Sequence, residues 1–524
     1  MEYAAPPHVT QNWQITKPAA SGRRGIVVSQ SRDAALAGIA ILEAGGTAMD
    51  AAVATALALA TVEPWNSGLG GIGFTLVHPA GAARAEVVDF GPRAAKAVDP
   101  AAYRLTGRMT TDLFAWPEVE GDINIHGPLS AAIPASVAGY EAIHRRWGRL
   151  PLADVMAPAI ALARRGLSQD WYTTLKIASS ASVIRRYPTT AEVYLPGGLP
   201  PVPPYQGVPG FFKQGNLAAT LEQLSRAGLR DFYEGAVAEA VAADARELGS
   251  WIGADDLRDC QARFRPAESV SWRGRDLQLT GGLTASPTLR AVLARMAGAD
   301  FSGGAPNAGW YRALAQAMQA AYAERFAGLG ENEPDAAQSC TTHLTVCDAA
   351  GNVVAMTTTL MSSMGSRVLL PRSGVLLNNG MMWFDPRPGT PNAIAPGKRP
   401  LCNMLPVILC ENGKPLLAAG ASGGRRIMAS VLQLMSFIAD FGMDVATAAH
   451  HPRIDVSGVD AVTADSRLAP VMLAALEGCG HVEVMEHAAM PINFACPNAI
   501  LLGADGVRHG VSDVASPWSA AIAQ

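Results

Sequence analysis

The strongest constraint on the fold is a change of pattern near residue 339. Before it, most periodic segments are helical in character, including an amphipathic helix expected at 312–326. An acidic segment with Gly and Pro, GLGENEPDAAQ at 328–338, then interrupts the chain and is expected to be exposed. Strand-like runs dominate after it, up to a helix expected at 427–441. Helices before an exposed linker and strands behind it predict an α+β protein, in particular a layered αββα arrangement.

The individual elements can be placed by their residues. A strand is expected at 25–29, then a helix that Gly45-Gly46 ends and an alanine-rich helix that Asp50 caps. Two more strands are expected at 74–77 and 86–90. In the second part of the chain, strands are expected at 342–347, 353–359, 375–377, 407–410 and 416–418.

Composition limits the function classes. The chain has 524 residues and a net charge of −4, which gives no reason to expect a nucleic acid or an anionic membrane as partner. Its seven cysteines are an odd number without C-x-x-C spacing, which favours reduced thiols in a cytosol over disulfides. We see no signal peptide, and the apolar run at 51–62 is too short to span a membrane. We therefore expect a cytoplasmic protein, and without H-E-x-x-H or spaced Cys/His sets we expect no metal.

Two glycine-rich motifs have weak alternative interpretations. GLGGIG at 68–73 matches the dinucleotide fingerprint literally, but a strand is expected after it where that fingerprint needs a helix. We expect these glycines to let backbone segments pack closely inside the core, and we expect no nucleotide cofactor and no other cofactor. GASGG at 420–424 approaches the G-x-S-x-G elbow of serine hydrolases but lacks its spacing.

The chemistry centres on SCTTHLTVCDAAGNVVAMTTTLMSS, residues 339–363. Cys340, Thr341 and Thr342 are adjacent possible nucleophiles at the head of an expected β-hairpin, without an obvious base nearby. Threonines are common in strands, so β propensity alone accounts for many of them. If the chain were cut before a threonine, however, the freed amine would supply the missing base to that residue's hydroxyl. Gly423-Gly424 could then aim backbone N–H groups at a developing oxyanion.

At these residues the chain resembles the γ-glutamyltransferase family of N-terminal nucleophile hydrolases. The matching blocks run through nearly the whole sequence: ILEAGGTAMDAAVATALALATVEPW at 41–65, GLGGIGF at 68–74, IPASVAGYEAIHRRWGRLPLADVMAPAIALARRG at 133–166, NLAATLEQLSRAGLRDFYEGAVAEAVA at 216–242, TTH at 341–343, DAAGNVVAMTTTL at 348–360, SGVLLNN at 373–379, PGKRPL at 396–401 and GGRRI at 423–427. The resemblance implies a four-layer αββα sandwich and synthesis as a precursor. It also implies self-cleavage between Cys340 and Thr341 into a large segment, 1–340, and a small segment, 341–524, which stay together as a heterodimer; further dimerisation is left open.

The resemblance also assigns roles to residues. It makes Thr341 the nucleophile, Thr359 the second threonine that hydrogen-bonds it, and Gly423 and Gly424 the oxyanion-hole pair. The family's glutamyl contacts, by contrast, are replaced: Gly91 stands where an arginine grips the carboxylate, with Arg93 two residues further on. The other replaced positions are Met361, Gly380, Trp383, Cys402 and Asn403.

These losses predict a substrate other than glutathione, because a glutamyl group's charges would be unpaired in a desolvated site. The loop at 385–398 is shorter than the lid segment of many family members. The resemblance therefore implies a site open to water, in which hydrolysis of the acyl-enzyme is favoured over transfer to an amine. Arg93, Arg425 and Arg426 could reach a carboxylate, and the pattern looks most like members that hydrolyse oxamate in purine breakdown. A γ-glutamyl hydrolase or transferase, a cephalosporin-type acylase, and an uncleaved binding protein remain the alternatives.

Overall fold

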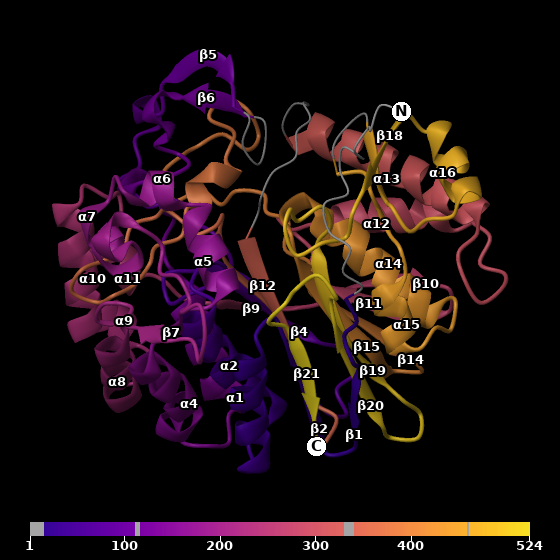
Figure 1. Ribbon diagram of the computed structural model, residues 1–524, viewed down its shortest axis with the longest axis horizontal. Coiled ribbons are helices and arrows are strands. Elements are labelled where there is room, and N and C mark those ends of the chain that lie inside the picture. The colour runs from indigo at the N-terminus through magenta and orange to yellow at the C-terminus, as the bar shows by residue number, and fades with distance from the viewer. Residues whose placement is uncertain (1–14, 111–115, 330–339, 458–460) are drawn as a thin grey trace.

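Two seven-stranded sheets lie face to face between two layers of helices (Figure 1). The computed structural model describes residues 15–110, 116–329, 340–457 and 461–524. The acidic segment expected at 328–338 lies mainly outside the described residues. The four layers are those of an αββα sandwich, so the predicted fold class is confirmed.

Sheet I has the strand order β21-β2-β12-β13-β3-β4-β9. Its strands are β21 (Ala520–Ala523), β2 (Gly25–Ser29), β12 (Cys340–Asp348), β13 (Val353–Met361), β3 (Ile72–His78), β4 (Glu86–Phe90) and β9 (Arg263–Pro266). All six pairings between neighbouring strands in it are antiparallel. The helices packed on its outer face are α1 (Arg32–Glu43), α2 (Ala48–Val62), α3 (Ser136–Trp147), α4 (Leu152–Arg165), α8 (Leu217–Ala227) and α10 (Ala236–Glu247).

Sheet II has the order β1-β20-β19-β15-β14-β11-β10. Its strands are β1 (Ala20–Gly22), β20 (Arg508–Ser512), β19 (Cys496–Leu502), β15 (Lys414–Ser422), β14 (Val407–Glu411), β11 (Arg275–Leu279) and β10 (Glu268–Trp272). Its outer face carries α12 (Ser286–Met296), α13 (Ala308–Leu329), α14 (Ile427–Ala439), α15 (Val445–His450) and α16 (Pro470–Glu477). Strand β15 packs across β12 and β13, which joins the two sheets at the centre of the molecule.

Shorter helices and strands lie outside the two large sheets. They are α5 (Trp171–Ala178), α6 (Ala181–Ile184), α7 (Pro188–Tyr194), α9 (Asp231–Glu234), α11 (Ala254–Arg258), the pairs β5 (Leu105–Met109) with β6 (Pro117–Val119) and β7 (Leu167–Ser168) with β8 (Phe211–Phe212), and the small sheet of β16 (Ile454–Asp455), β17 (Ala461–Asp465) and β18 (His481–Met485). Among the helices of the described ranges, none combines the length and apolar character needed to cross a membrane.

The residues before and after position 340 interleave in both sheets. In sheet I, β12 lies between β2 and β13, so a strand of the second part pairs directly with one of the first. In sheet II, β11 pairs with β14 and β1 pairs with β20 in the same way. Separating the two parts would break these ladders and expose the core between the layers. A cut at residue 340 is therefore compatible with two segments that stay associated.

Helix α2 explains the alanine-rich run. Its residues from Ala48 to Thr61 are all buried, because the helix packs between α1, α4 and sheet I. Small side chains allow such close neighbours. The prediction that Asp50 caps this helix was wrong in detail: Thr47 is the N-cap and accepts from the Asp50 N–H, while the Asp50 carboxylate accepts from Thr47 N at 2.9 Å. This reciprocal pair is a capping box.

The glycine motif at 68–73 leads into strand β3, as predicted, and its glycines allow close packing. A Cβ on Gly70 would overlap the Leu376 carbonyl, and one on Gly73 would lie 2.5 Å from the Thr357 oxygen. The strand expected at 375–377 was wrong: Leu376 and Leu377 form only isolated bridges, to Leu369 and Gly70. A three-residue apolar run has too little pattern to separate a strand from a buried loop.

Candidate active site

The predicted β-hairpin is confirmed, and its regular pairing is interrupted at Thr341. Strands β12 and β13 pair antiparallel from Cys347–Val353 up to Thr342–Thr358. The register then shifts by one residue, so that Cys340 pairs with Met361. Such bulges bend a strand and re-aim side chains, and they are common next to active sites. The predicted cleavage point therefore coincides with the irregular end of the hairpin; the Cys340 side chain lies outside what the structure describes.

The two predicted catalytic threonines are hydrogen-bonded to each other. The Thr341 hydroxyl donates to Thr359 Oγ1 at 3.3 Å, and the Met361 N–H donates to the same oxygen at 2.7 Å. Thr341 is 2% exposed, and Thr359 and Met361 are fully buried. Met361 has φ +87°, an uncommon conformation for a residue with a long side chain. Its hydrogen bond to Thr359 helps to hold this turn of the backbone, and it also fixes the Thr359 oxygen that accepts from the Thr341 hydroxyl.

A buried polar network surrounds His343, two residues along β12 from Thr341. His343 Nδ1 is 2.8 Å from Thr357 Oγ1, and Nε2 is 3.1 Å from Thr345 Oγ1. Thr345 in turn donates to Asn498 Oδ1 at 2.9 Å, and Asn498 Nδ2 donates to the His343 carbonyl at 2.7 Å. Burial lowers the pKa of His343 to about 3, so the ring is neutral at working pH. The network ties β12 to β19 and fixes the distance between the two sheets.

The glycine pair predicted to form the oxyanion hole follows β15. Gly423 and Gly424 have φ of +136° and +62°, which other residues rarely adopt. A Cβ on Gly423 would lie 2.6 Å from Ala495 Cα. Ser422, just before this pair, accepts a hydrogen bond from Gln30, which follows β2. The end of β15 is therefore held beside the end of the strands of sheet I at which Thr341 lies. The oxyanion role of the two N–H groups stays a prediction.

Arg399, which the sequence argument did not single out, occupies the position next to Gly91. It pairs with Asp89 through Nη1 at 2.9 Å, and a Cβ on Gly91 would lie only 2.5 Å from Arg399 Nη2. Gly91 directly follows β4, which pairs with β3, and β3 pairs in turn with the strand β13 that carries Thr359. A guanidinium is present near the lost clamp, but it comes from a different segment.

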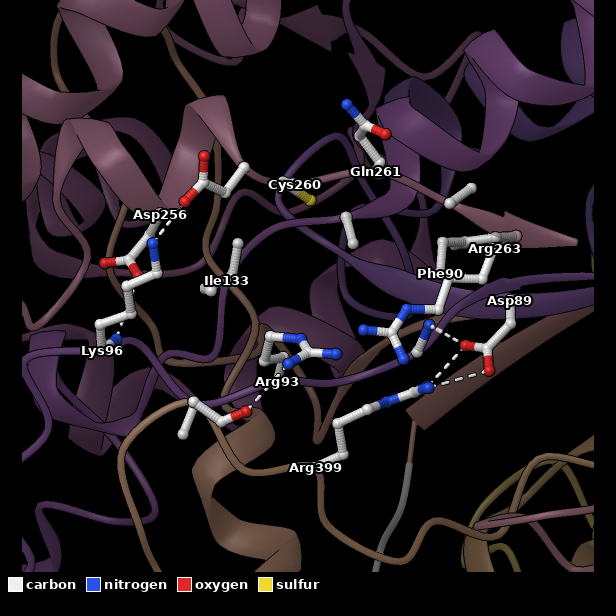
Figure 2. A pocket seen from close by; sticks show the side chains of 16 residues that line it. Asp89, Phe90, Arg93, Lys96, Ile133, Asp256, Cys260, Gln261, Arg263 and Arg399 are labelled. Atoms are coloured by element: carbon white, nitrogen blue, oxygen red, sulfur yellow. Dashed lines mark hydrogen bonds and ion pairs between the residues drawn. The ribbon is translucent and has the colours of Figure 1, made fainter.

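Arg93 points into a cavity of about 360 Å³ beyond this ion pair (Figure 2). Arg93 Nη1 donates to the Gly397 carbonyl at 3.0 Å, and its guanidinium converges with those of Arg263 and Arg399. Burial and the charges of Arg263 and Arg399 lower the pKa of Arg93. Asp89 neutralises Arg399, while the cavity's Lys96 pairs with Asp259. With Asp256 as the third lining carboxylate, four cations face three carboxylates, so the cavity has an excess of one positive charge, which suits a carboxylate.

The remaining predicted substrate residues separate into two groups. Cys402, Asn403 and Arg425 gather around Arg325, a buried residue that the sequence argument missed: Arg325 Nη2 donates to the Cys402 carbonyl and to Asn403 Oδ1, both at 2.9 Å. Burial and the neighbouring Arg325 lower the pKa of Arg425 to about 10.

Gly380 and Trp383 form the second group, in a 3-10 turn at Gly380–Trp383. A Cβ on Gly380 would lie 2.8 Å from Ala132 Cβ, so no glutamine side chain would fit there without a shift. The Trp383 carbonyl accepts from Asn392 Nδ2 at 2.7 Å, and its side chain is 5% exposed. Gly380 is closely packed and Trp383 is bulky, and their assignment to the substrate pocket stays a prediction.

Comparison with known proteins identifies what this architecture is similar to. The gamma-glutamyltranspeptidase family model matches residues 34–339 and 330–522. The glutathione hydrolase proenzyme of Escherichia coli K12 is 29% identical over 94% of this chain and 90% of its own length. The Acylase ACY 1 proenzyme of Pseudomonas sp. strain SE83 is 30% identical over 95% of this chain and 93% of its own. The crystal structure of cephalosporin acylase from Bacillus halodurans superposes with a TM-score of 0.84 over 100% of this chain and 99% of that one, at 22% identity, which shows the shared fold.

Proposed function

Since this chain belongs to the gamma-glutamyltranspeptidase family of N-terminal nucleophile hydrolases and is a hydrolytic enzyme of that family, we propose that it is a self-processing amidohydrolase whose nucleophile is the Thr341 hydroxyl. The observation that carries the proposal is the buried hydrogen bond from Thr341 to Thr359 at the bulge of the hairpin. The word proenzyme in the names of both relatives supports a maturation step.

In the mature enzyme, one residue supplies both nucleophile and base. Cleavage before Thr341 frees an α-amino group with a pKa near 8, so that part of it is neutral and accepts the hydroxyl proton. The oxygen attacks the substrate's amide carbon, and the N–H groups of Gly423 and Gly424 stabilise the resulting oxyanion. The ammonium then returns the proton to the departing amine. Water hydrolyses the Thr341 ester by the same route in reverse, which releases the acid.

The substrate in this proposal is a small amide that carries a carboxylate, with oxamate as the first candidate. Hydrolysis of oxamate would give oxalate and ammonia. The excess of positive charge around Arg93 and Arg263 supports a carboxylate-bearing substrate. Met361, Gly380 and Trp383 are apolar or closely packed, and none of the three supplies a carboxylate for the ammonium of a glutamyl head group, which argues against such a substrate.

A substrate panel tests the proposal. Ammonia release from oxamate is measured beside release of amine from glutathione, a glutaryl amide and short neutral acyl amides, with purified wild-type enzyme and Thr341→Ala. We expect turnover of carboxylate-bearing amides, little turnover of glutathione, and none by Thr341→Ala. Faster hydrolysis of glutathione than of every other amide would overturn the substrate assignment, and activity in Thr341→Ala would overturn the assignment of the nucleophile.

A further inference from the structure

An uncharged, proline-rich segment forms part of the protein surface. Residues 193–212, VYLPGGLPPVPPYQGVPGFF, contain no Asp, Glu, Lys, Arg or His. Residues 199–210, all of which the structure describes, belong to no helix or strand. They lie between α7 and α8 in the sequence, on the flank of the molecule away from the helices that cover sheet II (Figure 1). A surface stretch of this length without charge is unusual, because charged side chains make up much of an ordinary protein surface.

The apolar side chains of this segment project far into the solvent. Tyr205 is 100% exposed, Val208 84% and Val202 67%, and they are the three most exposed large hydrophobic residues in the described ranges. Leu199 is 64% exposed, and elsewhere among the described residues only Val471, at 66%, is comparable. Monomeric proteins rarely expose apolar side chains in a contiguous patch, and such patches usually mark contacts with other molecules.

The prolines give this segment a regular shape. Each proline fixes its own φ near −65° and favours an extended conformation in the residue before it. With prolines at 200, 201, 203 and 204, residues 199–205 favour polyproline II, which has three residues per turn. Leu199, Val202 and Tyr205 are spaced by three and therefore line one side of it. The burial agrees, because this side is exposed whereas Pro201 is buried.

Two hydrogen bonds hold the segment against the start of α5. Thr174 Oγ1 donates to the Pro201 carbonyl at 2.6 Å, and the Gln169 N–H donates to the Gly210 carbonyl at 2.8 Å. Trp171, which is exposed, lies between these two anchor points along the chain. The exposed apolar side chains therefore form one surface, the apolar ridge, which consists of Trp171, Leu199, Val202, Tyr205, Val208 and Phe211.

The apolar ridge has the composition and the size of an interface core. Such cores are depleted of charge and enriched in aromatic residues, which the ridge supplies as Trp171, Tyr205 and Phe211. An aromatic side chain offers about 150–250 Å², so the ridge is of the order of the ~800 Å² per partner that a standard interface buries. At its edge the Arg165 guanidinium stacks on Phe211 at 4.8 Å, as in a polar rim. Because the prolines already fix the shape, little conformational entropy is lost on contact.

We propose that the apolar ridge joins two copies of this chain about a two-fold axis, so that the ridge of one copy packs on the ridge of the other. An uncharged apolar surface carries no charge pattern to select a different protein, whereas it is complementary to itself. Homodimer interfaces are also the more apolar class. The proposal goes beyond the proposed function and is independent of self-cleavage, because cut and uncut copies carry the same ridge.

A proline-recognising domain is the other occupant that polyproline II would fit, and the orientation of the segment argues against it. Such domains receive the prolines of a P-x-x-P ligand in grooves lined by aromatic residues. Here Pro201 is buried, and Pro200 and Pro203 are half-buried. The side that faces the solvent presents Val202 and Tyr205 instead, which suits packing against another apolar surface.

The test measures the mass of the purified full-length protein by light scattering and sedimentation velocity, from about 1 µM to about 100 µM. We expect wild type to reach twice 54.6 kDa as its concentration rises. Tyr205→Asp places a carboxylate within the ridge and should raise the dissociation constant of the dimer about 100-fold or more. The matched control Val471→Asp adds the same charge at a similarly exposed apolar residue and should leave the dissociation constant unchanged. A single copy at every concentration of wild type, as a proline-recognising partner would leave it, overturns the proposal, and so does a dimer that Tyr205→Asp does not weaken.

Two further measurements separate an apolar contact from misfolding and from charge. Tyr205 is fully exposed, so each variant at this position should keep the wild-type circular dichroism spectrum. Tyr205→Phe keeps the ring and should dimerise within about threefold of wild type, and about 1 M NaCl should leave the wild-type dimer intact. A Tyr205→Phe dimer as weak as that of Tyr205→Asp, or dissociation in salt, would contradict an apolar contact. Thr341→Ala should dimerise like wild type, so a failure of the proposed function leaves this test decisive.

Discussion

Replacing Thr359 by valine tests the geometry of the nucleophile most sharply, because valine has the shape of threonine without its hydroxyl. The Thr359 oxygen accepts from Thr341 Oγ1 at 3.3 Å and from Met361 N at 2.7 Å. Thr359→Val therefore leaves the buried Met361 N–H without this acceptor. Loss of one buried hydrogen bond costs about 1 kcal/mol, and the positive φ of Met361 loses one of its supports.

Activity should fall along with stability. Without its acceptor the Thr341 hydroxyl is free to rotate away from the attacking direction, and lost orientation of this kind costs about 10- to 100-fold in rate. Urea unfolding gives the stability change, and cleavage rate and kcat give the chemical one. Thr359→Ser retains the oxygen and should stay within about threefold of wild type. The reasoning is wrong if Thr359→Val matches Thr359→Ser in both measurements.

Three other outcomes follow from the same structure. Gly420→Ala should lower the free energy of unfolding by at least about 2 kcal/mol, because its Cβ would overlap the His343 ring. The control Gly298→Ala has open space around its Cβ and should change the free energy of unfolding little. Equal effects of the two variants would contradict the packing around Gly420. Burial raises the pKa of Glu63 from the ordinary 4.5 to about 7, so its contribution to the free energy of unfolding is full below pH 4.5 and is lost as pH rises through 7. In urea unfolding, Glu63→Gln should remove up to about 3 kcal/mol of this pH dependence. An unchanged profile would show that Glu63 ionises normally. Arg93→Gln should raise the KM for carboxylate-bearing amides about tenfold and leave that for neutral amides unchanged; an equal rise for both would remove Arg93 from carboxylate binding.

Local patterns predicted the central elements of the fold, and long-range pairing set the others. The β12–β13 hairpin has two strands rich in Val and Thr around a turn, so its signal is contained within one segment. The edge strand β9 and the C-terminal β21 have little pattern of their own and exist because β4 and β2 offer open edges. The 375–377 run was assigned wrongly for the converse reason: it has strand-like residues but only isolated partners.

The same division holds for the site. Thr341, Thr359 and the glycine pair occupy recognisable motifs, and the structure brings the two threonines together. Arg399 and Arg325 had no signal, because their importance lies in partners far away in the sequence, such as Asp89 and Asn403. The oxamate substrate and the cytoplasmic location depend on chemistry that the fold does not encode, and they stay predictions.

Intact mass spectrometry of the purified protein tests the central claim most directly. The self-processing account predicts two fragments in wild-type protein, residues 1–340 and 341–524, with Thr341 as the new N-terminus and the two co-eluting under native conditions. It predicts one uncut chain of 524 residues for Thr341→Ala. A wild-type chain that stays whole after prolonged incubation, or a Thr341→Ala chain that is still cut at residue 340, would contradict it.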